Sequence, residues 1–396
     1  MVEGRSSSNF ERTGTKDALM ASRLSTRWLN YVLRTGEGFV DLWSDIFGSG
    51  RRDLLFIVGK GFDPRMCLAA KILVGLGGPG LRHCALVGYD EGSMSASHIH
   101  DKLVAANVET LTKLFSNHGS LDERHIRMWS DDGRRRVGSR GATEVFNSVD
   151  ELTHYTDVVL DISALPRSLY MPMLAKLLYL IDRTEGKPPN LHVVTADNPI
   201  LDGAINAEGI SDDASYLHGF ESGIEQESTA YIPKVWMPIL GEGKAVHFEK
   251  IHDLVAPDEI APIVPFPCAD PRRTDNLILE YRQLLFDRAR IEPANFIYIP
   301  EQNPFHVYRA IVEAVQHYSD ALQTLGGCKV IISALASKLL SLGALLAAYD
   351  LKSSGYCVGI AHVPASGYSI TTSAGEQPRT HSLFEVWIAG EPYDLC

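Results

Sequence analysis

Short apolar runs alternate with amphipathic stretches along most of the chain, and polar residues, Gly or Pro end each run. The first clear run covers residues 53–59, and a helical pattern at 66–76 and a second apolar run at 81–89 follow it. Residues 97–115 and 125–129 then continue as helix and strand. Regular alternation of strands and helices is typical of a parallel sheet that helices cover on both faces.

The strongest signal is the stretch 157–174, where a β-branched apolar run breaks into Asp161, Ser163 and Arg167 and then becomes helical in period. This pattern predicts a strand, a tight turn and a helix, with Ser163 near the N-cap and Pro166 close to the first turn. Such junctions lie at the carboxyl ends of parallel strands, where helix N–H groups face an anion. The stretch therefore predicts a small anionic ligand on a Rossmann-like sheet.

The alternation fades between residues 203 and 230, where Ser, Asp, Glu and Gly dominate, and it resumes with an irregular strand at 231–240. Further strands are predicted at 260–265, 296–299, 329–333, 357–362 and 383–388, the last as an edge strand. A length of 396 residues suits two domains. We therefore expect a tail with two short helices (1–50), a first Rossmann-like domain (51–202), a linker or insertion (203–230) and a second Rossmann-like domain (231–396).

The two halves carry similar motifs at their strand-to-helix turns, which predicts an internal duplication of one α/β unit. Residues 62–65 (Phe-Asp-Pro-Arg) match residues 269–272 (Ala-Asp-Pro-Arg). Residues 161–165 (Asp-Ile-Ser-Ala-Leu) likewise match residues 331–335 (Ile-Ile-Ser-Ala-Leu). Two such units would form a cleft between their strand ends. The match pairs Asp63 with Asp270 and Ser163 with Ser333.

Charged and hydroxyl side chains at these turns are the candidate ligand contacts, because cations and short polar groups neutralise and orient anions. In the first half they should converge on one electropositive crevice at the switch point of the sheet. The competing interpretation is structural, with Asp63 capping a helix and pairing with Arg65. The candidates are Lys60, Asp63, Arg65, Asp161, Ser163, Arg167, Asp270, Arg272, Ser333 and Lys338.

Catalytic motifs are absent from the sequence: it has no P-loop, no G-x-G-x-x-G fingerprint, no Gly-x-Ser-x-Gly elbow and no HExxH. The pair His98 and His100 lacks the further ligands of a zinc site. An enzyme that uses the interdomain cleft would have Asp63, Asp90 and Asp161 as general-base or metal positions. The sequence implies no specific cofactor.

The charge balance narrows the class of partner. A net charge of −12 argues against duplex nucleic acid, which proteins bind mainly through cationic side chains. A local exception is the loop Arg134–Arg140, which offers a site for an acidic protein partner or a polyanion. The apolar runs are too short to span a membrane and the first residues do not resemble a signal peptide. We expect a cytoplasmic protein, with an oligomeric state left open.

The stretch from Val159 to Arg167, with the apolar helix after it, resembles the CARF-type Rossmann-like sensor domains that recognise cyclic oligonucleotides. Those domains carry Asp-hydrophobic-Thr-Gly-Gly-Thr-Lys at this turn. Asp161 and Ser163 match the first positions, while both glycines and the lysine are missing. The likeness covers about a dozen residues in each half, and it implies a signalling nucleotide bound across two units in a prokaryotic defence setting.

Taken together, these patterns predict a duplicated α/β protein that binds a nucleotide or another phosphorylated small molecule as a sensor or accessory subunit. One alternative is an enzyme of the interdomain cleft, either a nucleotide hydrolase or a glycosyl or nucleotidyl transferase. The other is a structural subunit whose turns are merely capped and whose Arg134–Arg140 loop contacts another protein.

Overall fold

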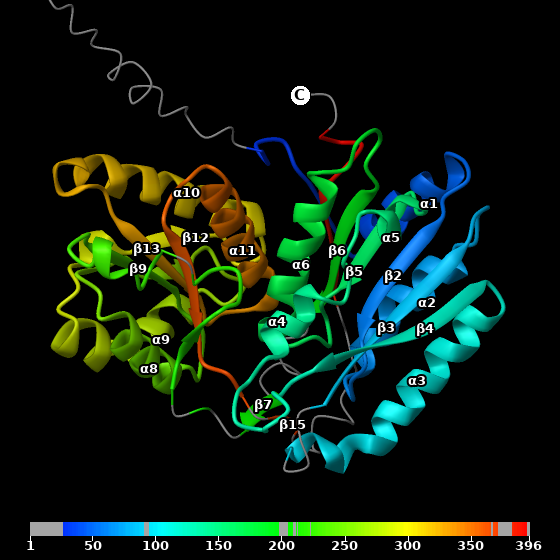
Figure 1. Cartoon of the computed structure of the whole chain (residues 1–396), viewed down its shortest axis with the longest axis horizontal. Coiled ribbons are helices and arrows are strands. Elements are labelled where there is room, and N and C mark those ends of the chain that lie inside the picture. The colour runs from blue at the N-terminus through cyan, green and yellow to red at the C-terminus, as the bar shows by residue number, and fades with distance from the viewer. Residues whose placement is uncertain are drawn as a thin grey trace, which may run out of the picture.

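The fold is α/β, with two sheets of seven strands each that lie side by side. The computed structural model describes residues 27–90, 95–197, 205–208, 211, 213–221, 223–365, 367–370 and 382–393. Helices α6 (Arg167–Ile181) and α11 (Lys338–Ser353) lie between the two sheets, as Figure 1 shows. Each sheet therefore belongs to a Rossmann-like unit, and the two units meet through this pair of helices.

The first sheet has the order β1-β16-β6-β5-β2-β3-β4. Strands β2 to β6 are parallel, and their order along the sheet is third, second, first, fourth, fifth, as in doubly wound nucleotide-binding folds. The sheet consists of β1 (Val32–Thr35), β2 (Leu54–Gly59), β3 (Arg82–Asp90), β4 (Gly119–Arg127), β5 (Asp157–Asp161), β6 (Asn190–Asp197) and β16 (Ser382–Ala389).

Every residue of β2 and of β5 is buried, as expected for central strands that helices cover on both faces. These strands are the apolar runs that the sequence pattern predicts. The helices around this sheet, besides α6, are α1 (Glu37–Gly48), η1 (Pro64–Cys67), α2 (Leu68–Gly75), η2 (Ala96–His100), α3 (Asp101–Ser116), α4 (Gly138–Thr143) and α5 (Asp150–Thr153).

The second sheet has the order β12-β11-β9-β13-β14-β8, with the short β10 paired to β9. Its five parallel strands β9, β11, β12, β13 and β14 again follow the order third, second, first, fourth, fifth. The sheet consists of β8 (Ser215–Tyr216), β9 (Lys234–Ile239), β10 (Glu259–Ile260), β11 (Ile263–Pro265), β12 (Ile297–Ile299), β13 (Lys329–Ala334) and β14 (Val358–His362).

The remaining elements of the second half cover this sheet or join the two units. Strands β7 and β15 form a small antiparallel sheet of their own, at the bottom of Figure 1. The elements are β7 (Ile205–Glu208), β15 (Gly367–Ile370), η3 (Glu227–Thr229), α8 (Ala245–Val255), α9 (Arg273–Glu280), η4 (Gln283–Arg288), η5 (Pro293–Asn295), α10 (Pro304–Ala321) and η6 (Gln323–Leu325).

Two of the expected boundaries are wrong. The last strand, β16, lies in the first sheet, where it pairs antiparallel with β6 and with β1. The expected linker contributes β8 to the second sheet and buries Leu217, Phe220 and Ile224. In the N-terminal segment, residues 27–50 hold the helix α1 and the edge strand β1, while residues 1–26 lie outside the described residues, so the expectation of two helices is not tested in full.

The two units share one apolar core, because a continuous cluster of buried side chains includes residues of both. Leu169 and Leu177 of α6 belong to this cluster together with Leu339 of α11 and Ile311 of α10. A strand order that recurs in both sheets agrees with an internal duplication, which stays a prediction. Ser163 and Ser333 both lie at the end of the fourth strand of their unit.

The pairing of Asp63 with Asp270 is wrong. Asp63 follows β2, the first strand of its unit, whereas Asp270 follows β11, the second strand of the other unit. The element equivalent to β2 is β9, and the turn after it contains Gly241, Glu242, Gly243 and Lys244. The similar sequences at residues 62–65 and 269–272 thus belong to turns at non-equivalent positions in the two sheets.

Candidate functional site

A cavity of about 830 Å³ lies between the two units, at the carboxyl ends of their parallel strands. Turns that follow β2, β3, β5 and β6 line it from the first unit, and turns that follow β9, β11, β12 and β13 line it from the second. This volume is within the usual range for small-molecule sites. Seven of the predicted residues line the cavity: Lys60, Asp63, Arg65, Ser163, Arg167, Asp270 and Lys338.

The other three predicted residues lie outside the lining. Ser333 is fully buried and accepts a hydrogen bond from Trp236 Nε1 at 2.9 Å, which is a packing role. Arg272 is exposed at the start of α9, and its neighbour Arg273 lines the cavity instead. Asp161 is fully buried behind the turn and accepts a hydrogen bond from the Ser163 N–H at 2.8 Å.

Asp161 carries an unusual carboxyl group. Burial raises its pKa to about 7, while hydrogen bonds from Ser163 and the charge of Lys338 act in the opposite direction. Its Oδ2 atom has no hydrogen-bond partner among the described residues. Because it does not reach the cavity, its role is to hold the turn that carries Ser163.

The turn after β2 supports the capping interpretation of its two charged residues. Asp63 accepts a hydrogen bond from the Arg65 N–H at 3.0 Å and pairs with the Arg65 guanidinium at 2.7 Å. Lys60 pairs with Glu123 at 2.6 Å in the same region. These cations are neutralised locally, so the expected electropositive crevice around Lys60 and Arg65 is wrong.

The turns after the fourth strands place two cations across the boundary between the units. Arg167 of the first unit donates to the Ala336 carbonyl and, at 3.0 Å, to Ser341 Oγ of the second. Lys338 of the second unit donates to the Ser163 carbonyl of the first. The exchange is reciprocal, since each cation is the first residue of its helix and reaches the turn of the other unit.

Helix N-termini meet at this crossing. Helices α6, α8 and α11 begin at residues 167, 245 and 338, and none carries an acidic residue in its first turn. The positive ends of the three helix dipoles therefore face the cavity that Arg167, Lys244 and Lys338 line, and no carboxylate in the first turn of these helices offsets them. This arrangement favours a bound anion.

Sequence reasoning missed Lys244, which lines the cavity from the turn after β9. Its ammonium has no ion pair or hydrogen bond within the described part of the chain. Burial lowers its pKa, and the charge of Arg167 lowers it further. The available signal was the recurrence of Gly59-Lys60-Gly61 as Gly241-Glu242-Gly243, directly before Lys244.

Close approaches at two glycines fix the geometry of the turns. A Cβ on Gly59 would lie 2.6 Å from Leu165 Cδ2, and a Cβ on Gly241 would lie 2.3 Å from the Leu335 carbonyl oxygen. In both units the turn after the first strand thus packs against the leucine that follows the fourth strand. Tyr281 holds the second of these turns by donating to the Gly241 carbonyl at 2.7 Å.

Carboxylates surround this cationic centre. Arg273 pairs with Glu242 at 2.6 Å and also with Glu301, which neutralises it. Asp90, the last residue of β3, and Asp270, which follows β11, line the cavity at the second strands of the two units. This distribution matches a ligand whose negative charge lies near its centre and whose hydroxyl or amino groups lie toward its ends, where they can donate to the carboxylates. The described residues contain no group of His, Cys, Asp or Glu arranged to hold a metal ion.

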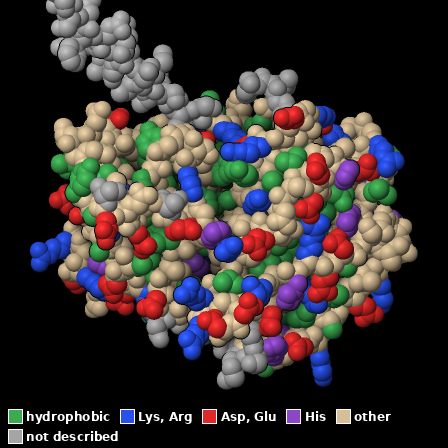
Figure 2. Space-filling model, viewed as in Figure 1, with side chains coloured by type: hydrophobic (Ala, Val, Ile, Leu, Met, Phe, Trp, Pro, Cys, Tyr) green, Lys and Arg blue, Asp and Glu red, His purple; other side chains and the backbone are tan. Residues whose placement is uncertain are grey.

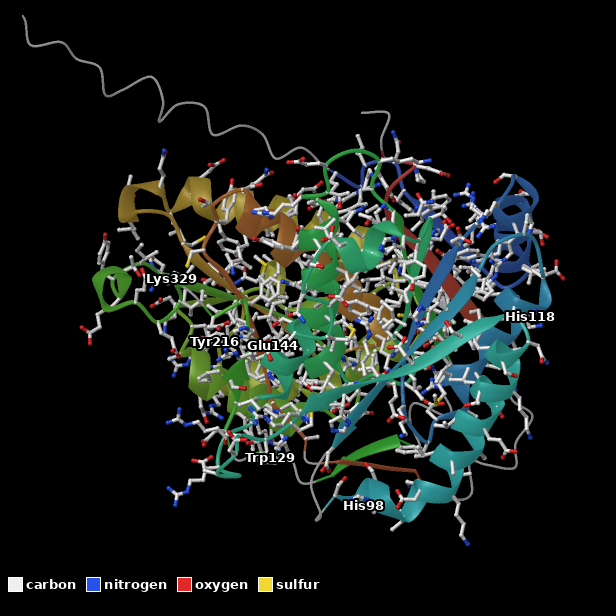
Figure 3. All side chains as sticks on the ribbon, turned by 45° about the vertical axis from the view of Figure 1, so that its right-hand side comes forward. His98, His118, Trp129, Glu144, Tyr216 and Lys329 are labelled. Carbon is white, nitrogen blue, oxygen red and sulfur yellow. The ribbon has the colours of Figure 1, made fainter. Side chains whose placement is uncertain are left out.

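The Arg134–Arg140 loop is partly exposed, and one of its arginines contacts the second unit. Arg136 lies over the Trp129 ring at 4.9 Å and donates to the Ala365 carbonyl of the second unit. Figure 3 shows Trp129 on the segment after β4, near the second unit. Arg134, Arg135 and Arg140 are exposed, and contact of this loop with another protein stays a prediction.

On the face shown in Figure 2, acidic and basic side chains are interspersed, and neither kind gathers into one large patch. Duplex nucleic acid is usually bound by a basic stripe. Among the residues described, no helix combines the length and apolar character that a membrane span needs. The cytoplasmic location stays a prediction.

No protein-family model matches this chain, and no curated protein matches it. Among solved structures, the chain is similar to a universal stress protein from Archaeoglobus fulgidus DSM 4304, with 8% sequence identity and a TM-score of 0.21. The alignment covers 77% of this chain and 95% of that one.

Proposed function

We propose that this protein binds a nucleotide or another phosphorylated small molecule in the cavity between its units, as a sensor or accessory subunit. The reciprocal crossing of Arg167 and Lys338 carries this proposal. Both cations donate to carbonyl oxygens of the other unit, at a place where helix N-termini also line the cavity. A phosphate oxygen is a stronger acceptor for either cation than a backbone carbonyl.

Binding at the crossing suits a sensor because the same side chains hold the two units together. A phosphate that accepts from Arg167 or Lys338 competes with the Ala336 and Ser163 carbonyls for those donors. Occupancy would therefore change the contacts between α6 and α11, and a differential contact of this kind is what couples a ligand to a conformation. The resemblance to CARF-type sensor domains at Asp161 and Ser163 supports the same proposal.

The carboxylates around the centre favour a nucleotide over a bare phosphate. In doubly wound folds an acidic residue that follows the second strand accepts hydrogen bonds from ribose hydroxyls. Asp90 and Asp270 occupy this place in the two units and both line the cavity. Ribose hydroxyls and base amino groups are the donors that such carboxylates can bind.

A thermal-shift screen against nucleotides, cyclic oligonucleotides included, tests the proposal. A ligand at a hundred times its dissociation constant stabilises the fold by about 2.7 kcal/mol, which raises the melting temperature visibly. We expect a shift with at least one nucleotide, and a smaller shift in the Arg167→Gln protein. Equal melting temperatures with and without every nucleotide would contradict the proposal.

Catalysis in the same cavity is the second proposal, because three titratable side chains meet over Gly88. A Cβ at this glycine would lie 3.1 Å from Glu123 Oε1, 3.4 Å from His125 Nδ1 and 3.7 Å from Lys60 Cδ. An acid, a base and a cation at one place suit a hydrolase or transferase. To distinguish a binding protein from an enzyme, any nucleotide that stabilises the protein is incubated with it for a long period and then analysed by chromatography. Recovery of the intact nucleotide would contradict the proposal of catalysis.

A further inference from the structure

The two units line the cavity with different kinds of side chain, although their strands follow the same order. Among the described residues that line it, the aromatic rings all come from the first unit and are those of Phe62, Tyr89, His98 and His125. The second unit lines it with carboxylate and amide side chains and with no aromatic ring in the described part of the chain. The two sides of the cavity therefore suit different chemical groups.

Phe62 offers a fixed flat surface on the side of the first unit. It is half-buried, and its ring packs against the ring of His100 with 4.5 Å between the ring centroids. Asn107 of α3 donates to the Gly61 carbonyl at 3.1 Å and so holds the turn that carries this ring. Nucleobases gain much of their affinity by stacking on aromatic side chains. A nucleobase therefore has a ring to stack on in the first unit.

The second unit presents carboxylates that its own residues hold in place. Both carboxylate oxygens of Glu242 accept from the Arg273 guanidinium, at 2.6 and 2.9 Å. The same guanidinium donates to Glu301, whose other carboxylate oxygen accepts from the Ala269 N–H at 2.9 Å. Each carboxylate oxygen has two lone pairs, so both groups can accept further hydrogen bonds.

Three more polar side chains on this side can reach a ligand. Asp270, Asn276 and Gln302 line the cavity and are exposed. Asp270 accepts from the Arg272 N–H at 2.9 Å through one oxygen, while Asn276 and Gln302 form no side-chain hydrogen bond with the described residues. Carboxylates accept from hydroxyl groups, and amides both accept from them and donate to them. This side therefore suits a group with several neighbouring hydroxyls.

We propose that the ligand is a nucleoside diphosphate joined to a sugar. The base stacks on Phe62, the diphosphate lies at the crossing of Arg167 and Lys338, and the sugar donates to the polar side chains of the second unit. The inference rests on the proposed function, because it uses the same phosphate position. A diphosphate esterified at both ends carries about one negative charge for each phosphate, which matches the two crossing cations.

The difference between the two sides decides among phosphorylated ligands. A molecule with two bases, such as a cyclic dinucleotide, would place one base against Glu242, Asp270 and Asn276, where the described residues offer no ring to stack on. A nucleotide without a further group would leave these acceptors to water. A site built to bind hydroxyl groups discriminates strongly against analogues that lack them.

Isothermal titration calorimetry with matched ligand pairs tests the sugar side. The pairs are adenosine diphosphate with its glucose conjugate, guanosine diphosphate with its mannose conjugate and uridine diphosphate with its glucose conjugate. We expect the conjugate to bind at least about tenfold more tightly in one pair, although conjugation removes the charge of a terminal phosphate. Conjugates that bind no more tightly than their diphosphates in any pair would overturn the inference.

Substitutions in the second unit test where the sugar lies. Asp270→Asn and Asn276→Ala should each reduce the preference for the conjugate to about threefold or less, while the affinity for the free diphosphate stays within about twofold. Asp275→Asn is the matched control, because Asp275 is exposed on α9 and does not line the cavity. A preference that survives both substitutions would overturn the inference.

A substitution in the first unit tests where the base lies. Phe62→Ala should weaken the binding of diphosphate and conjugate to the same extent, by about fivefold or more. Phe266→Ala is the control, since Phe266 is an exposed ring of the second unit that does not line the cavity. Unchanged affinities in the Phe62 variant would overturn the position of the base. Phe62→Leu, which keeps an apolar side chain without a ring, replaces Phe62→Ala should that protein not fold.

The outcomes separate this inference from the proposed function. If nucleotides bind while the conjugates gain no affinity, the inference on the sugar fails and the proposal of a nucleotide site stands. If neither free nucleotides nor conjugates bind, both fail. A conjugate preference that Asp270→Asn and Asn276→Ala abolish supports both.

Discussion

Glu385→Gln should destabilise the protein, because Glu385 joins the last strand to the first sheet through a buried histidine. Glu385 on β16 accepts from His192 Nδ1 at 2.7 Å and from Trp43 Nε1 at 3.0 Å. His192 Nε2 lies 3.3 Å from Asp157, and its ring lies between those of Trp43 and Trp387. Glu385, His192 and Asp157 are fully buried.

The size of the effect follows from the pKa of His192. Burial alone would lower this pKa, but the charges and hydrogen bonds of Glu385 and Asp157 raise it to about 9. A rise from an ordinary value of about 6.5 corresponds to about 3 kcal/mol of folding free energy. Since removal of one partner from a buried ion pair costs about 3 to 5 kcal/mol, we expect Glu385→Gln to lose about 3 kcal/mol at mildly acidic pH.

The effect should depend on pH in a defined direction. A histidine whose pKa is raised by folding contributes its full stabilisation below the unfolded pKa, near 6.5, and loses it as pH rises through about 9. The difference in unfolding free energy between wild type and Glu385→Gln should therefore become smaller from neutral to alkaline pH. Urea unfolding at a series of pH values measures this difference.

Glu391→Gln is the matched control, because Glu391 is one third exposed and pairs with Arg52 at 3.0 Å near the same end of the chain. We expect its cost to stay within about 1 kcal/mol. A loss from Glu385→Gln no larger than that of the control, or one equally large at neutral and alkaline pH, would refute a charged His192 between two carboxylates.

Four further substitutions test packing in and around the site. Gly241→Ala should lower the free energy of unfolding in urea by about 1 to 3 kcal/mol, because the new Cβ would meet a backbone oxygen. Gly59→Ala should lower it by less, because the leucine side chain that its Cβ would meet can rotate. Equal losses in the two variants would contradict this reasoning. Arg136→Ala should lower stability by about 1 kcal/mol through the lost contact with an aromatic ring, and an unchanged melting temperature would show that the contact is dispensable. Ser333→Ala should lower the free energy of unfolding by about 1 to 3 kcal/mol, because it leaves the Trp236 N–H buried without a partner. Nucleotide affinity should not change in this variant. Weaker binding would show that Ser333 contacts the ligand after all.

Much of the fold could be predicted because hydrophobic periodicity reports local structure well. The alternation of strands and helices gave the α/β class, and the position of Ser163, Arg167 and Lys338 at helix starts followed from turn chemistry. The partner of a strand is not encoded locally. Residues 382–389 have the apolar pattern of an edge strand, and only distant contacts such as Glu385 with His192 place them in the first sheet.

The site was harder to predict because its charge depends on pairings between side chains. Asp63 and Arg65 are only two residues apart and neutralise each other, so their charges could not be counted as free. Lys244 was missed because the motif match at 269–272 made the strand predicted at 260–265, rather than the irregular strand at 231–240, the first strand of the second unit. The residues that did match, Asp270 and Arg272, follow β11, which is not the equivalent of β2.

Isothermal titration with the nucleotide that stabilises the protein most tests the central claim most directly, which is that a phosphate binds where Arg167 and Lys338 cross. Wild type is compared with Arg167→Gln, with Lys338→Gln and with the exposed control Arg134→Gln. We predict that each of the first two substitutions weakens binding by about tenfold or more, since each removes a charge-assisted contact, and that the control binds as wild type does. Unchanged affinity in both crossing variants, with only their melting temperatures lowered, would show that these cations merely join the two units.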